Sequence, residues 1–392
     1  MDTLSTLLGI GQSLWLEDTT REQLQSGLLV QHIQEGSITG AAITPLACSR
    51  VLRRTGVYDG AIRKKLAAGL FGEPLAMKLL LEDARHAADL LRPIYERTDG
   101  VDGWVALALF TPPASDTTAA VAAIATAYAK ARRPNILLTL PGLPEWLPAI
   151  EEVIYSGVPV NIAFLLSREQ FLSAARTCLR AIERRTAAGL KPAVTSFASI
   201  SIGRLAAALS AELTGEASFE SATAMARRIY KTSRDLHNSP EWERAYNSGA
   251  RPLRLVWTME TADEGQRLSD SLIKNLMAPL TVAAIPETAL KAITGDVFLG
   301  TSLPADGGDC EKVLAGHPHQ GIDLNTCAVK LQNTEAAALT SSWIEMLDAV
   351  ACKSAFVTNP DERDKYLHEI PFINNKKGIS KVLNVKRSPA TD

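Results

Sequence analysis

The chain alternates between short apolar runs and longer amphipathic segments, and this alternation limits its fold more than any other feature. Eight apolar runs predict buried β-strands, at residues 13–17, 40–44, 104–110, 135–140, 160–166, 193–202, 253–259 and 280–285. Helical patterns lie between them, the clearest at residues 75–95, 116–132, 167–188 and 218–236. Strands that alternate with helices are typical of parallel βα units, and eight such units predict an α/β fold, a closed (β/α)8 TIM barrel.

The competing architecture is an open, doubly wound sheet. Neither GxGxxG nor GxxxxGK[ST] follows any predicted strand, so an open sheet of this sequence would lack its usual phosphate-binding loop. Most of the predicted strands are continuous apolar runs, which indicates that both of their faces are buried. The barrel is therefore the favoured fold.

The C-terminal part of the chain has a different character. Residues 301–321 are rich in Gly, Pro and Asp and predict an irregular loop. Residues 336–352 predict a terminal helix whose apolar face carries Trp343, Met346, Leu347 and Val350. Further on, the sequence has mixed charge and then becomes basic, which is typical of a segment outside the main core.

We therefore divide the chain into a barrel, residues 1–351, and a C-terminal helical and loop extension, residues 352–392. The extension is either loosely packed or, as Tyr366 and Phe372 suggest, a lid or a subunit contact. The sequence leaves the oligomeric state open, with a homodimer among the alternatives.

Composition excludes several classes of protein. The chain has 392 residues, of which 46% are hydrophobic and 21% charged, and its formal net charge is -2, so a basic nucleic-acid-binding surface is not expected. Neither an apolar run long enough for a membrane helix nor a signal peptide is found in the sequence. The five cysteines are widely spaced and form no CxxC pair, which is typical of reduced cysteines in the cytoplasm.

Several stretches of the sequence, in matching order and spacing, resemble the longer bacterial transaldolases. They are residues 11–18 (GQSLWLED), 89–95 (DLLRPIY), 100–103 (GVDG), 133–135 (RPN), 147–151 (LPAIE), 160–161 (VN), 250–252 (ARP), 286–288 (PET) and 342–343 (SW). The resemblance covers roughly residues 10–351. It implies a (β/α)8 barrel that moves a dihydroxyacetone unit between sugar phosphates through a lysine imine, without a metal or other cofactor. The iminium serves as an electron sink for carbon–carbon cleavage.

The resemblance places Thr139 where the family has its imine-forming lysine. A hydroxyl cannot form an imine with a ketose, so the usual chemistry is not open to this residue. The lysines of the chain lie in predicted helices, in loops or in the tail, and none ends a predicted strand, where barrel enzymes place their reacting groups. The sequence therefore predicts a transaldolase-like protein without the family's imine.

Other matched positions lose charge or hydrogen-bonding capacity relative to the family: Ala42, Thr44, Ala108, Phe110, Ala163 and Met259. Asn161, Ser199 and Arg204 keep the family's residue types, and Arg204 matches a phosphate-binding arginine. Each buried polar group of a sugar phosphate left unpaired costs about 1–3 kcal/mol, so recognition of such a substrate should fail.

The same positions predict a remodelled binding pocket for a small molecule. Its expected substrate-binding residues are Thr44, Ala108, Phe110, Thr139, Asn161, Ser199, Arg204, Trp257 and Met259. Phe110, Trp257 and Met259, with Ile43, favour an apolar ligand without a phosphate. Two of these assignments have simpler alternatives, since Trp257 could belong to the core and Arg204 to a structural ion pair.

Glu17 is the best candidate for a catalytic group. It matches the family's proton-shuttling aspartate at the end of the first strand, and burial would raise its pKa towards the range of a general acid or base. A capping or ion-pairing role is the simpler alternative. The neighbouring Asp18 should point away from the pocket as a loop or cap residue. Glu260 is either a second carboxylate or a solvated loop residue, and His317 and His319 make a weak metal signal in a loop.

Three functions remain open at this point. The first is an enzyme repurposed for biosynthesis, in specialised metabolism, that cyclises, isomerises or condenses an apolar metabolite by acid–base or shape-driven chemistry. The second is a barrel that binds a ligand or partner without catalysis. The third is a weak or altered transaldolase, which Thr139 disfavours.

Overall fold

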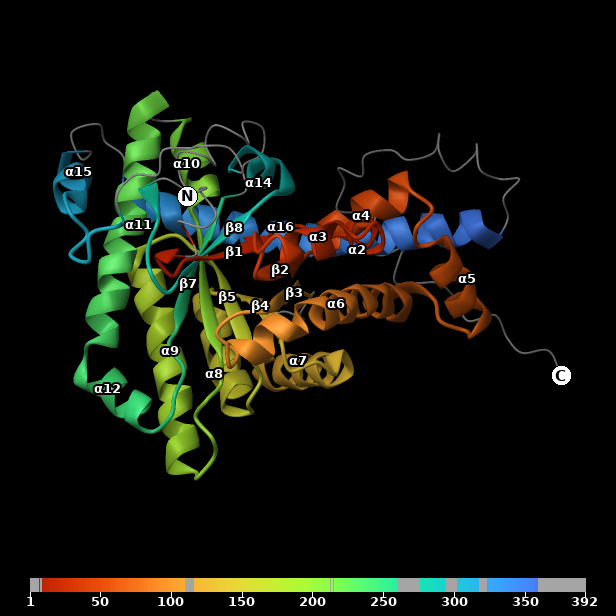
Figure 1. Ribbon diagram of the computed structural model, residues 1–392, viewed down its shortest axis with the longest axis horizontal. Coiled ribbons are helices and arrows are strands. Elements are labelled where there is room, and N and C mark those ends of the chain that lie inside the picture. Colours follow the sequence, from red (N-terminus) through yellow and green to blue (C-terminus); the bar gives the residue numbers. More distant parts are fainter. Residues whose placement is uncertain are drawn as a thin grey trace.

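A computed structural model of the chain describes residues 7, 9–109, 116–211, 213, 215–259, 275–293, 302–316 and 323–358 (Figure 1). Within these ranges, eight parallel strands follow one another in sequence order around a closed barrel. They are β1 (Ser13–Leu16), β2 (Gly40–Ile43), β3 (Val105–Ala108), β4 (Ile136–Pro141), β5 (Val160–Leu165), β6 (Ser196–Ser201), β7 (Arg254–Thr258) and β8 (Thr281–Ile285). The predicted barrel is confirmed, and the open sheet is wrong.

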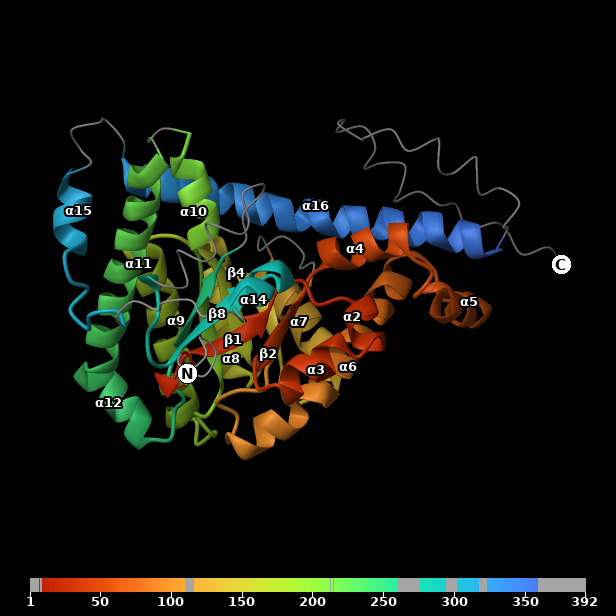
Figure 2. The ribbon, with the colours of Figure 1, turned by 45° about the horizontal axis from the view of Figure 1, so that its top comes forward.

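Helices surround the barrel (Figures 1 and 2). Those in the described ranges are α2 (Arg21–Gln25), α3 (Leu28–Gln34), α4 (Pro45–Arg54), α5 (Asp59–Ala67), α6 (Gly72–Arg97), α7 (Thr117–Ala131), α8 (Leu147–Tyr155), α9 (Arg168–Ala187), α10 (Ile202–Leu209), α11 (Gly215–His237), α12 (Pro240–Asn247), α14 (Glu287–Ile293), α15 (Cys310–Gly316) and α16 (Leu324–Thr358), with a 3-10 turn, η1, at Pro144–Trp146. The four helices predicted most clearly are α6, α7, α9 and α11. Side-chain hydrogen bonds cap the first turns of several of these helices. In α4, for example, the Thr44 hydroxyl accepts a hydrogen bond from the Ala47 N–H at 3.2 Å.

Alternate residues of each strand point into the barrel, and the others point towards the helices. The inward residues form a cluster of their own: Trp15, Trp104, Ala106, Leu137, Phe197, Val256, Val282 and Ala284. The ring centroids of Trp15 and Phe197 lie 4.9 Å apart, and those of Trp104 and Phe197 lie 6.2 Å apart. These three rings fill the middle of the barrel, while the outward residues join the larger core beneath the helices.

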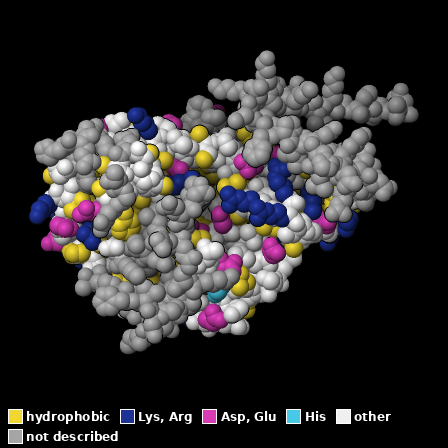
Figure 3. Space-filling model, turned by 90° about the horizontal axis from the view of Figure 1, so that it is seen from above, with side chains coloured by type: hydrophobic (Ala, Val, Ile, Leu, Met, Phe, Trp, Pro, Cys, Tyr) yellow, Lys and Arg dark blue, Asp and Glu magenta, His cyan; other side chains and the backbone are white. Residues whose placement is uncertain are grey.

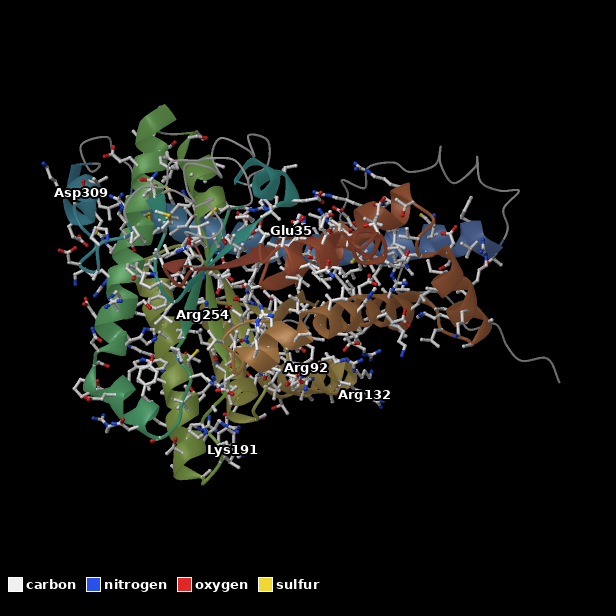
Figure 4. All side chains as sticks on the ribbon, in the orientation of Figure 1. Glu35, Arg92, Arg132, Lys191, Arg254 and Asp309 are labelled. Atoms are coloured by element: carbon white, nitrogen blue, oxygen red, sulfur yellow. The ribbon has the colours of Figure 1, made fainter. Side chains whose placement is uncertain are left out.

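A buried ion pair lies at the amino end of the strands. The Arg254 guanidinium donates to Ser13 Oγ at 2.7 Å and to Asp102 Oδ1 at 3.2 Å, and its Cζ lies 5.6 Å from the centre of the Phe197 ring. Figure 4 labels Arg254 close to the strands, whereas Lys191 lies far out on the periphery. Pairing makes burial of the Arg254 charge tolerable, and the pair supports the aromatic residues above it.

The C-terminal region differs from the prediction in two places. α15 interrupts the predicted irregular loop at residues 301–321, and the predicted terminal helix is the longer α16. Trp343, Met346 and Val350 are buried as expected, and Leu347 packs against the core. The boundary at residues 351 and 352 stays a prediction, and most of the proposed extension, including Tyr366 and Phe372, lies outside the described residues.

α16 runs along one side of the molecule from α10 to α5 (Figure 2). Asp348 pairs with Arg53 of α4 at 2.7 Å. Lys353 Nζ donates to the Thr55 carbonyl at 2.8 Å and lies 3.1 Å from Asp59 Oδ1. These contacts hold the second half of α16 against α4 and α5.

The described surface carries charges of both signs. In the view of Figure 3, Lys and Arg side chains lie among Asp and Glu side chains over the part of this face that the structure describes. Among the described helices, none is long and apolar enough to cross a membrane.

Gly40 of β2 is required by the packing of Trp15. A Cβ atom at residue 40 would lie 2.3 Å from both Cδ1 and Nε1 of that indole. Gly40→Ala must therefore displace a ring packed inside a closed barrel, and it should lower the free energy of unfolding by roughly 1–3 kcal/mol, measured by urea denaturation. The control is Gly60→Ala on the exposed surface of α5, where a Cβ meets nothing within 4 Å. Equal free energies of unfolding for the two variants would contradict the close packing of Trp15 against Gly40.

Candidate active site

A cavity of about 180 Å³ opens at the carboxyl ends of the strands. Its floor includes Trp15, Ala106, Val256 and Ala284, which also belong to the inward cluster. Its walls come from β1 to β8 and from one face of α16. This is the end at which barrel enzymes place their reacting groups.

Most of the residues that the sequence singles out border this cavity together: Glu17, Thr44, Ala108, Thr139, Asn161, Ser199 and Arg204. They come from β1 to β6 and from the loops and helices that follow these strands. Phe110, Glu260, His317 and His319 lie outside the described residues. The structure thus gathers residues spread over nearly 200 positions of the sequence, while their roles remain a prediction.

Trp257 and Met259 are exceptions, because neither borders the cavity. Both are almost completely buried in the core between the barrel and its helices. The inward positions of β7 are Val256 and Thr258, one residue away from those predicted. Side chains alternate along a strand, so an error of one residue moves a predicted pocket residue to the opposite face.

A chain of hydrogen bonds crosses β4, β5 and β6 in the cavity wall. Ser199 Oγ donates to Asn161 Oδ1 at 2.7 Å, and Asn161 Nδ2 donates to Thr139 Oγ1 at 3.4 Å. Asn161 and Ser199 are almost completely buried. The carboxamide of Asn161 therefore fixes the orientation of the Thr139 hydroxyl and can present it to a ligand.

Two carboxylates lie on the opposite side, after β1. Asp18 borders the cavity next to Glu17, so the expectation that it points away is wrong. Its backbone has a φ of 50°, in the left-handed region that Asp tolerates better than most residues. Thr44 Oγ1 donates to Asp18 Oδ1 at 2.5 Å, which links this carboxylate to the start of α4.

A second buried ion pair anchors the segment that follows these carboxylates. Arg21 Nε of α2 donates to Asp83 Oδ1 of α6 at 2.5 Å, and Tyr58 Oη donates to Asp83 Oδ2 at 2.6 Å. Burial raises the pKa of the Asp83 carboxyl, and the Arg21 charge opposes that rise. Because α2 begins three residues after Asp18, this pair fixes the loop that carries Glu17 and Asp18.

Phe164 borders the cavity, although nothing in the sequence pattern indicates it. Its φ of 64° lies in the left-handed region, and the register between β5 and β6 shifts between Ile162 and Leu165. This bulge lets the consecutive residues Ala163 and Phe164 both border the cavity. An aromatic residue in this conformation carries a strain of about 1–2 kcal/mol, which the surrounding contacts must offset.

α16 supplies the remaining wall through Glu335, Ala338, Leu339 and Ser342. Arg204 Nε lies 3.1 Å from Glu335 Oε2, so the guanidinium at the mouth of the cavity belongs to an ion pair. The predicted alternative of an ion pair at Arg204 is therefore correct, with a partner that the sequence did not indicate.

Known proteins match this sequence along most of its length. The family model described as Transaldolase/Fructose-6-phosphate aldolase matches residues 14–350. The chain belongs to the transaldolase family. The transaldolase of Thermobifida fusca (strain YX) is 30% identical over 363 residues, which cover 89% of this chain and 97% of that protein. The transaldolase of Mycolicibacterium smegmatis is 30% identical over 361 residues, which cover 88% and 96% respectively.

The side chains around the cavity limit the chemistry that it can support. Among the residues described, no lysine borders it, and Arg204 carries the one positive charge in its wall. In the same part of the chain, no group of three His, Cys, Asp or Glu residues is placed to hold a metal ion. The groups at hand are carboxylates, hydroxyls and an amide, which can move protons and orient a ligand.

The left-handed backbone at Phe164 gives a testable difference between two substitutions. Phe164→Gly should be more stable than Phe164→Ala by roughly 0.5–1 kcal/mol, because glycine adopts positive φ without strain. Thermal or urea denaturation of both variants measures the difference. Ala163→Gly is the control, since Ala163 has no positive φ and should lose roughly 0.5–1 kcal/mol. A Phe164→Ala protein more stable than Phe164→Gly would contradict the strained geometry.

Proposed function

We propose that this transaldolase-family barrel acts without a lysine imine and performs acid–base chemistry on a small, non-phosphorylated metabolite, with Glu17 as the acid or base. Cyclisation, isomerisation or condensation in a biosynthetic pathway are reactions that such a site can catalyse. The observation that carries the proposal is Thr139, which stands on β4 at the place of the family's lysine by the resemblance of the flanking segments.

The surroundings of Thr139 support this proposal. A primary amine is needed to form an imine with a ketose, and a hydroxyl without an adjacent base is a poor nucleophile. Asn161 hydrogen-bonds the Thr139 hydroxyl, and among the described residues no carboxylate or imidazole forms a hydrogen bond with it. Thr139 is therefore suited to binding a ligand and unsuited to covalent catalysis.

The two carboxylates support the assignment of acid–base chemistry. Glu17 and Asp18 are neighbours in the sequence and both border the cavity, which the left-handed turn at Asp18 permits. Thr44 donates a hydrogen bond to Asp18 and stabilises its charged form. Two carboxyl groups in different environments can divide the roles of acid and base, and we assign the proton exchange to Glu17.

The walls indicate a small ligand with an apolar part and a few neutral polar groups. The cavity volume of about 180 Å³ is below the roughly 300 Å³ at which pockets for drug-sized ligands begin. The apolar floor faces small side chains such as Ala108 and Ala163, and Phe164 adds an aromatic face. Ser201 and Thr258 add two hydroxyls to those of Thr139 and Ser199. The polar side of the site therefore favours a hydroxylated or carbonyl-bearing metabolite over a hydrocarbon.

Borohydride reduction tests the absence of an imine. The protein is incubated with fructose 6-phosphate, reduced with sodium borohydride and weighed by intact-protein mass spectrometry, beside an active transaldolase as a positive control. We expect an adduct on the control and none on this chain, because Thr139 has no amine. A reduced sugar adduct on any lysine of this chain, together with saturable thermal stabilisation by fructose 6-phosphate, would overturn the proposal.

Substitution of Glu17 tests the acid–base assignment. Wild-type protein is incubated with a pool of non-phosphorylated metabolites, and depletion of each compound is followed by mass spectrometry. Glu17→Gln should slow the depletion at least about 100-fold, the usual contribution of a general acid or base. Glu22→Gln, an exposed change on α2, is the matched control and should keep wild-type rates. Binding of a metabolite without depletion by wild-type protein would instead support a ligand-binding barrel.

A further inference from the structure

Glu335 places a carboxylate at the mouth of the cavity, beside the guanidinium of Arg204. Its side chain is 8% exposed, while that of Arg204 is 30% exposed, and the two are 3.1 Å apart. Both residues border the cavity. Arg204 lies in the first turn of α10, directly after β6, so its charge stands where it could otherwise meet an anionic ligand.

The position of Glu335 is fixed one turn earlier in α16. Gln332 Nε2 donates to the Gly142 carbonyl at 3.0 Å, just after β4. Gln332 Oε1 accepts from Gln170 Nε2 of α9 at 3.0 Å. Gln332 is itself almost completely buried, so these bonds hold the helix against the barrel. Residues three apart lie on the same face of a helix. The hydrogen bonds of Gln332 therefore also hold Glu335 towards the cavity.

We propose that Glu335 is a specificity-determining residue: its carboxylate takes the place of a ligand's anionic group at Arg204, and so it rejects phosphorylated and carboxylated ligands. The inference deepens the proposed function by explaining why the metabolite should lack a phosphate. The described wall holds three carboxylates, those of Glu17, Asp18 and Glu335, against the one guanidinium. An anionic ligand must therefore displace Glu335 from Arg204 in a wall that also holds the carboxyl groups of Glu17 and Asp18.

Phosphate binding by Glu335→Gln tests the inference. Glutamine keeps the shape of the side chain and removes its charge, which leaves Arg204 with an uncharged partner. Inorganic phosphate, titrated at constant ionic strength and followed by calorimetry, should bind this variant at least about tenfold more tightly than wild-type protein. The gain should disappear in the double variant Glu335→Gln/Arg204→Gln, because the site at Arg204 is then absent.

A matched control separates this local effect from a change in overall charge. Glu345→Gln removes one negative charge from an exposed position of the same helix and should leave phosphate binding unchanged. Glu335→Ser, which also removes the charge, replaces Glu335→Gln if the latter fails to fold by circular dichroism. Wild-type protein that binds phosphate as tightly as Glu335→Gln, or a gain that survives Arg204→Gln, would overturn the inference.

These outcomes are independent of the proposed chemistry. Phosphate binding needs no turnover, so a result against Glu335 as a specificity determinant leaves the absence of an imine untouched. An imine trapped by borohydride would in turn refute the proposed function, whatever Glu335→Gln does to phosphate affinity.

Discussion

Closure of the barrel is the constraint on which the rest of the structure depends. In a closed parallel sheet every second side chain of every strand must share one interior, so the volume of each inward residue limits the others. Trp15, Trp104 and Phe197 fill that interior, and Gly40 is small because the Trp15 indole lies against it. The open volume is thereby restricted to the carboxyl ends of the strands, above these rings.

The wall of the cavity on the β4 and β5 side is joined to α16 by a short series of contacts. The Gly142 N–H donates to the Ala163 carbonyl at 2.8 Å, and a Cβ at residue 142 would approach Leu165 Cδ2 to 2.6 Å. Gly142 thus lies tightly against the bulge that turns Phe164 into the cavity, while its own carbonyl accepts from Gln332 of α16. The strained bulge and the position of α16 therefore stabilise each other.

Periodicity predicts the strands and helices well, because burial of both strand faces leaves a strong signal in the sequence. Periodicity does not predict which side chains face the cavity where apolar and polar residues fail to alternate, or where the backbone departs from a regular strand. The apolar run at residues 253–259 does not distinguish inward from outward positions. Trp257 and Met259 therefore lie in the core instead of the cavity wall, which for Trp257 is the alternative that the sequence leaves open. Asp18 and Phe164 were missed because left-handed backbone reverses the expected direction of a side chain. Glu335 was missed because the predicted helix began one residue after it.

The two kinds of polar group in the cavity lie on opposite sides of it. β1 and β5 lie on opposite sides of an eight-stranded barrel, so Glu17 and Asp18 face the hydrogen-bonded chain of Thr139, Asn161 and Ser199 across the cavity. That chain can hold a hydroxyl or carbonyl group of a ligand in one orientation, because the carboxamide fixes which hydroxyls donate and which accept. A ligand held there presents its far side to the two carboxylates, where a proton can be exchanged. The described wall therefore has a side of oriented hydroxyl and amide groups and a side of carboxyl groups, an arrangement that suits the proton transfer proposed for this site.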